Sequence, residues 1–321
     1  MQRILGPSSS ACGAYIPHAG TLRSMCSALY VDDEALVRSA AQRTALLPVG
    51  LRDRVEAFGA HPEPLGCLLL RGLPVGHLPP TPVEPTTPTT KDDASELLLL
   101  SVANLLGEPV GYQPEHGGDV VQNIVPVRSS SVRQTSTSSR VELMFHTEAA
   151  FHPHRPRFLL LLCLRGDPQA RTTVASINAA LPHLSSPVIE TLFQPRFRCA
   201  VDESYLHGRN NVLGAPIAVL TGRHTNPAMV FDEDLMVGTD EAADDALRQL
   251  GEALSAHHDG IVLESGDLVI IDNDMVVHGR SPFAPRFDGT DRWLQRAFVV
   301  TNLAASHNER TGRMITTVFG D

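Results

Sequence analysis

Hydrophobic residues along this chain fall mostly into short runs between turn-forming residues, and two longer segments predict helices. The segment from Asp92 to Leu106 predicts a helix with acidic residues in its first turn, which Gly107 ends. The segment from Asp240 to about His257 predicts a second helix, because one apolar stripe runs through Ala243, Leu247, Leu250 and Leu254.

Most of the remaining pattern in the second half predicts β-strands. Phe158–Leu164 (FLLLLCL) is too short for most helices and predicts a strand that is buried on both faces. Gly260–Asp272 contains two apolar runs around a Ser-Gly-Asp turn, and Arg296–Thr301 is a further strand candidate. Short strands between Gly, Pro and Asp turns predict a mainly β fold with flanking helices, of the sandwich or jelly-roll type.

A Pro/Thr-rich stretch, residues 78–91, is the one candidate for an interdomain linker. A loop lying over a single domain is the favoured alternative, because the composition does not change on either side of it. We therefore predict one domain over residues 1–321, with residues 1–60 as a helical N-terminal extension that packs on the core.

Composition narrows the class of partner. The formal net charge of −10 disfavours nucleic acid and suits a small cationic molecule, although overall charge is weak evidence for any one ligand. No run reaches the roughly 18 apolar residues that a membrane span needs, and residues 1–16 lack the apolar core of a signal peptide. The five cysteines have no CxxC spacing, which predicts reduced and mostly buried thiols in a cytoplasmic protein. The oligomeric state is not predicted.

Histidine followed two residues later by a carboxylate is the first candidate for chemistry. On a strand, residues i and i+2 share a face, so His146 and Glu148 would point at one spot. The pattern alone is weak, because composition predicts roughly 1.6 such pairs and each has a solvated histidine as its alternative. The chain contains four, namely His61/Glu63, His146/Glu148, His257/Asp259 and His307/Glu309.

Context favours the second pair. His278 follows a strand-like run and supplies a third ligand, which completes the two-His-one-carboxylate set that suits iron(II) and leaves positions open on the metal. Arg292 and Arg296 follow, and a guanidinium is a bidentate partner for the far carboxylate of a dicarboxylate cosubstrate. Ordinary ion pairs with Asp288 and Asp291 are the alternative for these arginines.

Several longer motifs together resemble clavaminate synthase and the related amino-acid hydroxylases. They are FHTEAAFHPHRP (145–156), LCLRGD (162–167), TTVAS (172–176), LLLRGLP (68–74), and the C-terminal stretch from GDLVIIDN (266–273) to DRWL (291–294). The resemblance covers roughly residues 65–305. It implies a double-stranded β-helix (a cupin-like jelly roll) and a dioxygenase that uses Fe(II), 2-oxoglutarate and O2.

Matched residue by residue, the resemblance also implies roles. The iron ligands would be His146, Glu148 and His278. Arg292, assisted by Thr172, would bind the far carboxylate of 2-oxoglutarate. Arg296 would bind the α-carboxylate of an amino-acid substrate, with the hydroxyl of Ser136 nearby. Chlorinating relatives lack the carboxylate ligand, so the presence of Glu148 favours hydroxylation or another oxidation.

Substrate choice depends on Asp232 and Asp234. They stand where arginine hydroxylases of the family, as in viomycin biosynthesis, carry two aspartates that hold the guanidinium. A solvated acidic loop is the alternative, since other acidic residues lie close by in the sequence.

We therefore predict hydroxylation of a free basic L-amino acid, lysine or arginine, with release of succinate and CO2. Two alternatives stay open. One is an oxygenase of the same family that performs cyclisation or desaturation, or that oxidises a sulfonate. The other is a non-catalytic jelly-roll protein that binds a metal or ligand.

Overall fold

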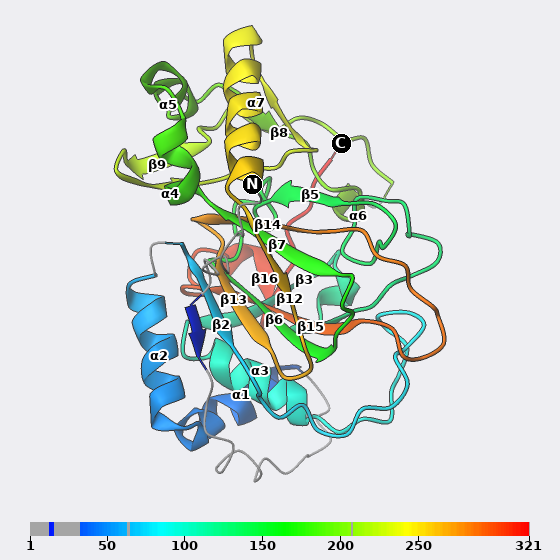
Figure 1. Ribbon diagram of the computed structural model, residues 1–321. Helices are drawn as coiled ribbons and strands as arrows, with labels where there is room; N and C mark the ends of the chain where they lie inside the picture. The colour runs from blue at the N-terminus through cyan, green and yellow to red at the C-terminus, as the bar shows by residue number, and fades with distance from the viewer. Residues whose placement is uncertain (1–12, 16–32, 63–64, 207, 321) are drawn as a thin grey trace, which may run out of the picture.

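The structure is a computed structural model that describes residues 13–15, 33–62, 65–206 and 208–320. Two β-sheets face each other, and helices cover their outer sides (Figure 1). The prediction of a mainly β fold with flanking helices is thereby confirmed. Within the described residues, no helix combines the length and the apolar character needed to cross a membrane.

The larger sheet carries the strands of both chain halves. Its order is β1 (Gly13–Tyr15), β2 (Cys67–Leu70), β13 (Leu268–Asp272), β6 (Phe158–Arg165), β15 (Trp293–Val300), β3 (Glu108–Tyr112), β17 (Met314–Ile315) and β16 (Arg310–Thr311), with β4 (Val121–Ile124) also paired to β15. The smaller sheet has the order β12 (Asp259–Val262), β7 (Arg171–Ser176), β14 (Val276–Arg280) and β5 (Leu143–His146). Two strand pairs stand apart, β8 (Phe197–Cys199) with β11 (Met236–Gly238), and β9 (Leu220–Arg223) with β10 (Asn226–Met229).

The helices fall into two groups. Beside the larger sheet lie α1 (Asp33–Arg43), α2 (Val49–Ala60) and α3 (Ala94–Ala103). Beside the smaller sheet lie α4 (Ile177–Ala180), α5 (Ser186–Leu192) and α7 (Glu241–Ala256), while α6 (Glu203–Leu206) is a single turn. Short 3-10 helices occur at η1 (Thr44–Leu46), η2 (His116–Gly118), η3 (Leu181–His183) and η4 (His307–Glu309).

Strand β6 shows why its sequence is apolar throughout. Leu160, Leu162 and Leu164 pack under the helices of the larger sheet. Leu159, Leu161 and Cys163 point the other way, into the core between the two sheets. Because both faces of the strand are covered, every position but its last is buried, as the sequence predicts.

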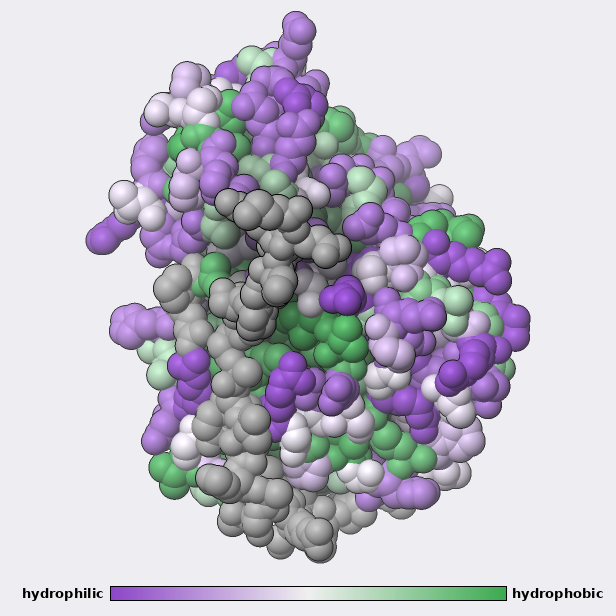
Figure 2. All heavy atoms as spheres, in the orientation of Figure 1, coloured by the Kyte–Doolittle hydropathy of each residue, from purple (hydrophilic) through white to green (hydrophobic). Residues whose placement is uncertain are grey.

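Both predicted helices are present. Helix α3 begins two residues later and ends three residues earlier than expected. Helix α7 matches closely, because the carboxylate of Asp240 accepts from the Ala243 N–H and caps its first turn. Its apolar stripe packs inward and its outer face is hydrophilic (Figure 2).

Two segments show what the pattern alone did not determine. The two apolar runs of Gly260–Asp272 enter different sheets, since β12 pairs with β7 whereas β13 pairs with β2 and β6. Residues 71–93 form neither helix nor strand. Thr81 of this loop donates to the carbonyls of Gly289 (2.8 Å) and Asp291 (2.7 Å), which ties it to the chain just before β15. Cys67, Cys163 and Cys199 are buried, as predicted, and Cys163 and Cys199 are free thiols, whereas Cys12 and Cys26 lie outside the described residues.

Candidate metal and substrate site

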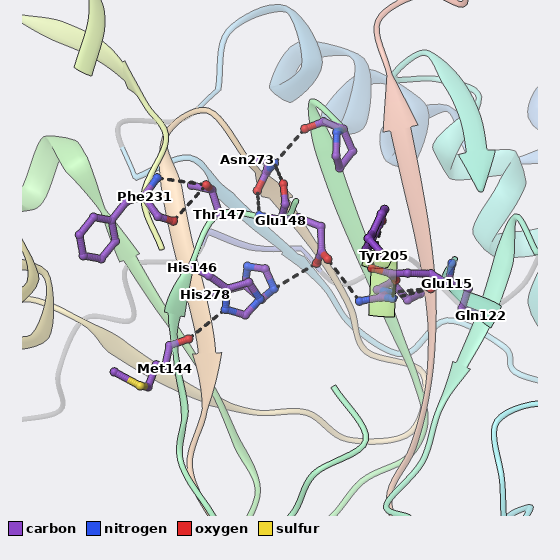
Figure 3. Close-up of polar contacts among 12 residues, drawn as sticks. Glu115, Gln122, Met144, His146, Thr147, Glu148, Tyr205, Phe231, Asn273 and His278 are labelled. Carbon is purple, nitrogen blue, oxygen red and sulfur yellow. Dashed lines mark hydrogen bonds and ion pairs between the residues drawn. The ribbon is translucent and has the colours of Figure 1, made fainter. Parts of the chain in front are cut away.

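His146, Glu148 and His278 lie together between the two sheets (Figure 3). One potential ligand atom from each lies within 4.8 Å of the others, and no other such group of three occurs among the residues that the structure describes. The antiparallel register pairs His278 of β14 directly with His146 of β5. Two histidines that are far apart in the sequence are thus neighbours across one strand pair.

Strand alternation turns both histidines toward the interior. Phe145 and Val277 pack against the outer helices of the smaller sheet. Successive side chains of a strand point to opposite faces, so His146 and His278 face the larger sheet. Thr172 of β7 faces the same way, because it is two residues from Val174 of the inter-sheet core.

Glu148 is placed differently from the expectation that it shares a strand with His146. Strand β5 ends at His146, and the chain then turns sharply at Ala149, whose φ of 52° is unusual for a residue with a side chain. The buried side chain of Asn273 holds this turn. Its Oδ1 accepts from the Glu148 N–H (2.7 Å), and its Nδ2 donates to the carbonyls of Glu148 (3.1 Å) and Pro156 (2.9 Å).

Replacing Asn273 with alanine should therefore loosen the turn that carries Glu148. The change leaves one N–H and two carbonyls without their partner in a buried region, at about 1–3 kcal/mol for each group left unsatisfied. We expect a clear loss of stability in urea unfolding together with weaker metal binding. Asn302→Ala, at an exposed position, is the control. Wild-type values of both quantities in Asn273→Ala would contradict this role.

The pKa shifts of Glu148 and His278 favour the deprotonated forms that bind a metal. Burial opposes charge on Glu148, but Arg296, His278 and His146 together lower its pKa to about 2. Burial, with His146 nearby, lowers the pKa of His278 to about 4. His146 Nδ1 lies 2.9 Å from the Met144 carbonyl, which makes Nδ1 the protonated nitrogen and leaves Nε2 free to coordinate.

The donor set fits a divalent first-row metal. Within the described part of the chain, the buried Oε2 of Glu148 has no hydrogen-bond partner, and it lies 3.5 Å from His278 Nε2. A carboxylate oxygen without a hydrogen-bond partner, next to two imidazoles, offers the type of atoms that coordinate a metal ion. Two histidines and one carboxylate leave three positions of an octahedral iron(II) open. His152 and His154, close in sequence, are not part of this group among the described residues.

Arg292 is a buried cation that has no ion-pair partner among the described residues. Its Nη2 lies 3.3 Å from the Thr172 hydroxyl, and in the described residues no carboxylate forms an ion pair with it. Burial lowers the pKa of this guanidinium, yet an arginine stays protonated in proteins. The ion pairs with Asp288 and Asp291, which were the alternative role for Arg292 and Arg296, are not found among the described residues, and Asp288 pairs with Arg286 instead.

Arg280 lines the same cavity, and both of its Nη atoms donate to the protein, whereas its buried Nε has no partner in the described residues. Arg280 donates to the Ser138 carbonyl, to the Ser138 hydroxyl (3.0 Å) and to the Val141 carbonyl (3.0 Å). Arg280 therefore fixes the loop that carries Ser136. Arg292, with the Thr172 hydroxyl as its side-chain contact at 3.3 Å, has more donors left than Arg280 to bind an anion.

Arg296 approaches Oε1 of Glu148, whereas His278 approaches Oε2 of the same carboxylate. Arg296 forms a close ion pair with Glu115, donates from Nε to Gln122 Oε1 (2.9 Å), and approaches Glu148 Oε1 to 3.5 Å. Glu115 in turn accepts from the Tyr205 hydroxyl at 3.2 Å. A buried cation thus stands next to a half-buried anion, which is an arrangement complementary to a zwitterion.

All nine residues predicted for the site line or reach one cavity of about 330 Å³. Asp232 bridges to His146 through the backbone and is buried, which raises its pKa. Its Oδ1 accepts from the N–H groups of Asp234 and Leu235. Asp234 is exposed and lines the cavity, as does Ser136.

Other residues of the site were not foreseen. They are Glu115, Gln122, Asp202, Tyr205 and Asn273. Only Asn273 fell within a quoted motif. Of the other three pairs of the His-x-carboxylate pattern, two supply no metal group in the described residues, and the third includes Glu63, which lies outside them. The histidines of all three pairs are exposed.

Comparison with known proteins agrees with this geometry. Residues 53–298 match the family model described as taurine catabolism dioxygenase TauD, TfdA family. The L-asparagine oxygenase of Streptomyces coelicolor is 39% identical over 288 residues, covering 87% of this chain and 84% of that protein. The L-lysine 3-hydroxylase of Catenulispora acidiphila is also 39% identical, covering 86% and 79%. Clavaminate synthase 2 of Streptomyces clavuligerus is 34% identical, covering 88% and 90%.

Solved structures resemble the whole arrangement. A crystal structure of asparagine oxygenase with Fe(II), 3-hydroxyasparagine and succinate superposes with a TM-score of 0.88 at 35% identity, covering 94% of this chain and 98% of that one. The non-heme iron oxygenase OrfP, in complex with Fe, succinate and (3S)-hydroxy-L-Arg, gives 0.84 at 29% identity, covering 95% and 100%.

Proposed function

Because this chain belongs to the TauD/TfdA family of dioxygenases, which use Fe(II) and 2-oxoglutarate, we propose that it hydroxylates a free basic L-amino acid, lysine or arginine. The observation that carries this proposal is a single cavity that joins the metal group to two sets of charges. One set is the Arg296–Glu115 pair, and the other is Asp232 with Asp234.

Each part of the cavity has a proposed partner. His146, Glu148 and His278 hold iron(II), and the far carboxylate of 2-oxoglutarate binds Arg292 and Thr172. Together, bound iron(II) and 2-oxoglutarate use O2 to convert the cosubstrate to succinate and CO2 while one oxygen atom enters a C–H bond of the substrate.

The substrate is oriented at both of its ends. Arg296, with the Ser136 hydroxyl nearby, attracts the α-carboxylate, and Glu115 beside it attracts the α-ammonium. Asp232 and Asp234 take the cationic end of the side chain. Two carboxylates at one cavity wall repel each other unless a cation lies between them. A sulfonate would add a further negative charge there, which disfavours that alternative.

The two facing sheets do not by themselves define the type of β fold. We infer a double-stranded β-helix, and the support is the way consecutive strands change sheets. From β5 to β6 to β7, and again from β12 through β13 and β14 to β15, every step crosses between the smaller and the larger sheet. The long connection between these two stretches, from β7 to β12, begins and ends in the smaller sheet and contains α7.

The substrate proposal predicts a charge-dependent preference. With Fe(II), ascorbate and 2-oxoglutarate, we expect succinate and a product with one extra oxygen from L-lysine or L-arginine. Norleucine, a neutral isostere of lysine, and asparagine should be much poorer substrates. Asp232→Asn and Asp234→Asn keep the shape but remove a charge, so kcat/KM for the basic substrate should fall by about 10–100-fold, as expected for a partly buried charge pair. The KM for 2-oxoglutarate should stay near its wild-type value.

Glu241→Gln, in the exposed first turn of α7, is the matched control and should behave as wild type. Equal turnover of norleucine and lysine by the wild-type protein would show that the two aspartates do not select the substrate. Exclusive turnover of asparagine would assign the amide-bearing substrate instead.

A further inference from the structure

The segment 316–320 follows β17 and is fixed at its start. Strand β17 pairs in parallel with β3, Met314 with Gly111 and Ile315 with Tyr112. The Thr316 N–H then donates to the Glu309 carbonyl (2.8 Å), and the Thr317 hydroxyl donates to Glu309 Oε2 (2.6 Å). The course of this segment past the larger sheet is therefore determined by several hydrogen bonds.

Near the end of this segment, Phe319 packs in an aromatic cluster beside the cavity. Its ring centroid lies 5.2 Å from that of Phe151, 5.1 Å from that of His152 and 6.0 Å from that of Tyr205, with edge-to-face angles of 66–85°. Gly320 lies close to the backbone that follows α6. A Cβ atom there would lie 2.8 Å from the Asn210 carbonyl oxygen and 2.9 Å from Arg209 Cβ.

Tyr205 connects this cluster to the substrate site. It is 2% exposed, lines the cavity together with Phe151, and donates its hydroxyl to Glu115. Glu115 is the ion-pair partner of Arg296. Tyr205 belongs to α6, a single turn, and an isolated turn of this length has little stability of its own.

We propose that Phe319 is a positioning residue for the amino-acid end of the cavity. Its ring packs against Tyr205 and holds α6 against the core. Tyr205 in turn keeps the Glu115 carboxylate oriented between its hydroxyl and Arg296, where the α-ammonium of the substrate binds. This inference depends on the proposed function for the identity of the ligand. It does not involve the metal ligands or Arg292, so it predicts an effect on the amino acid alone.

The test compares Phe319→Ala with Phe319→Tyr, which keeps an aromatic ring, and with Val318→Ala, whose side chain is 63% exposed. In Phe319→Ala we expect the KM for L-lysine or L-arginine, whichever the wild type uses, to rise about tenfold, the factor that the loss of an aromatic packing contact produces. The KM for 2-oxoglutarate and the bound iron should equal the wild-type values. Phe319→Tyr and Val318→Ala should stay near the wild type.

Limited trypsin digestion gives a second readout that needs no activity. Arg209 is exposed and follows α6, so cleavage after it should be faster in Phe319→Ala than in the wild type or in Val318→Ala. Three results would each overturn the proposal. They are equal rises in the KM for the amino acid and for 2-oxoglutarate, an unchanged KM for the amino acid, and unchanged cleavage after Arg209. If the wild type hydroxylates no amino acid, the proposed function fails, while the digestion still tests whether Phe319 holds α6.

Discussion

His278→Ala should abolish turnover and reduce iron(II) affinity by more than about 100-fold, since the loss of a mere outer partner of a metal ligand already costs roughly 10–100-fold. His278 is 6% exposed and its position is fixed by the register of β14 against β5 and β7. Among the described residues, no histidine besides His146 and His278 belongs to this group, so none could replace its imidazole. Metal content after dialysis against a fixed iron concentration measures the effect directly. Succinate formation measures its consequence.

Two other histidines make the test specific. His257→Ala removes an exposed histidine from the same sequence pattern, and His154→Ala removes one that is close to the site in sequence. Both should bind iron as the wild type does. Two results would show that the three-residue group has been assigned wrongly. One is wild-type iron content in His278→Ala, and the other is a similar loss of bound iron in His257→Ala and in His278→Ala.

Arg292→Ala should raise the KM for 2-oxoglutarate steeply while iron still binds. The substitution leaves the far carboxylate of the cosubstrate unpaired in a buried site, at about 2–5 kcal/mol. That range corresponds to roughly 30-fold to several thousandfold in affinity. Arg292→Lys keeps the charge but loses the planar fork that matches a carboxylate, so we expect it to recover only part of the loss.

Arg286→Ala serves as the control, because Arg286 lies in the same loop, is exposed, and pairs with Asp288. It should not change the KM for 2-oxoglutarate. If Arg292→Ala also left this KM unchanged, another arginine would have to bind the cosubstrate, and Arg296 would be tested first. Such a result would also free Arg292 for the substrate.

The sequence predicted those parts of the molecule that depend on local periodicity. Helix α7 and strand β6 have patterns that extend over several residues and a core that matches them, so their positions were close to correct. The sequence also identified all three members of the metal group, but only because long motifs singled out one of four equivalent pairs. The pattern itself carried almost no information about which pair would meet His278.

The residues that were missed lie mostly outside regular elements. Glu115 lies in a loop before η2, and Asn273 lies in the turn between β13 and β14. Their partners, Arg296 and Glu148, are more than 100 residues away in sequence. No periodic signal marks a residue whose role is set by a distant partner. Distant partners also decide the sheet to which a strand belongs. Strands β12 and β13 are adjacent in the sequence and yet belong to opposite sheets.

The contact between Asn273 and Glu148 has a consequence for the order of events in folding. It joins residues 125 positions apart, and the sheets that bring them together contain strands from both halves of the chain. Closing so long a loop costs chain entropy before any local contact offsets it, so such pairings form late. We therefore expect that iron does not act as a folding nucleus, as a metal can when all of its ligands are close in sequence. We expect it instead to bind the folded protein and to stabilise it by mass action.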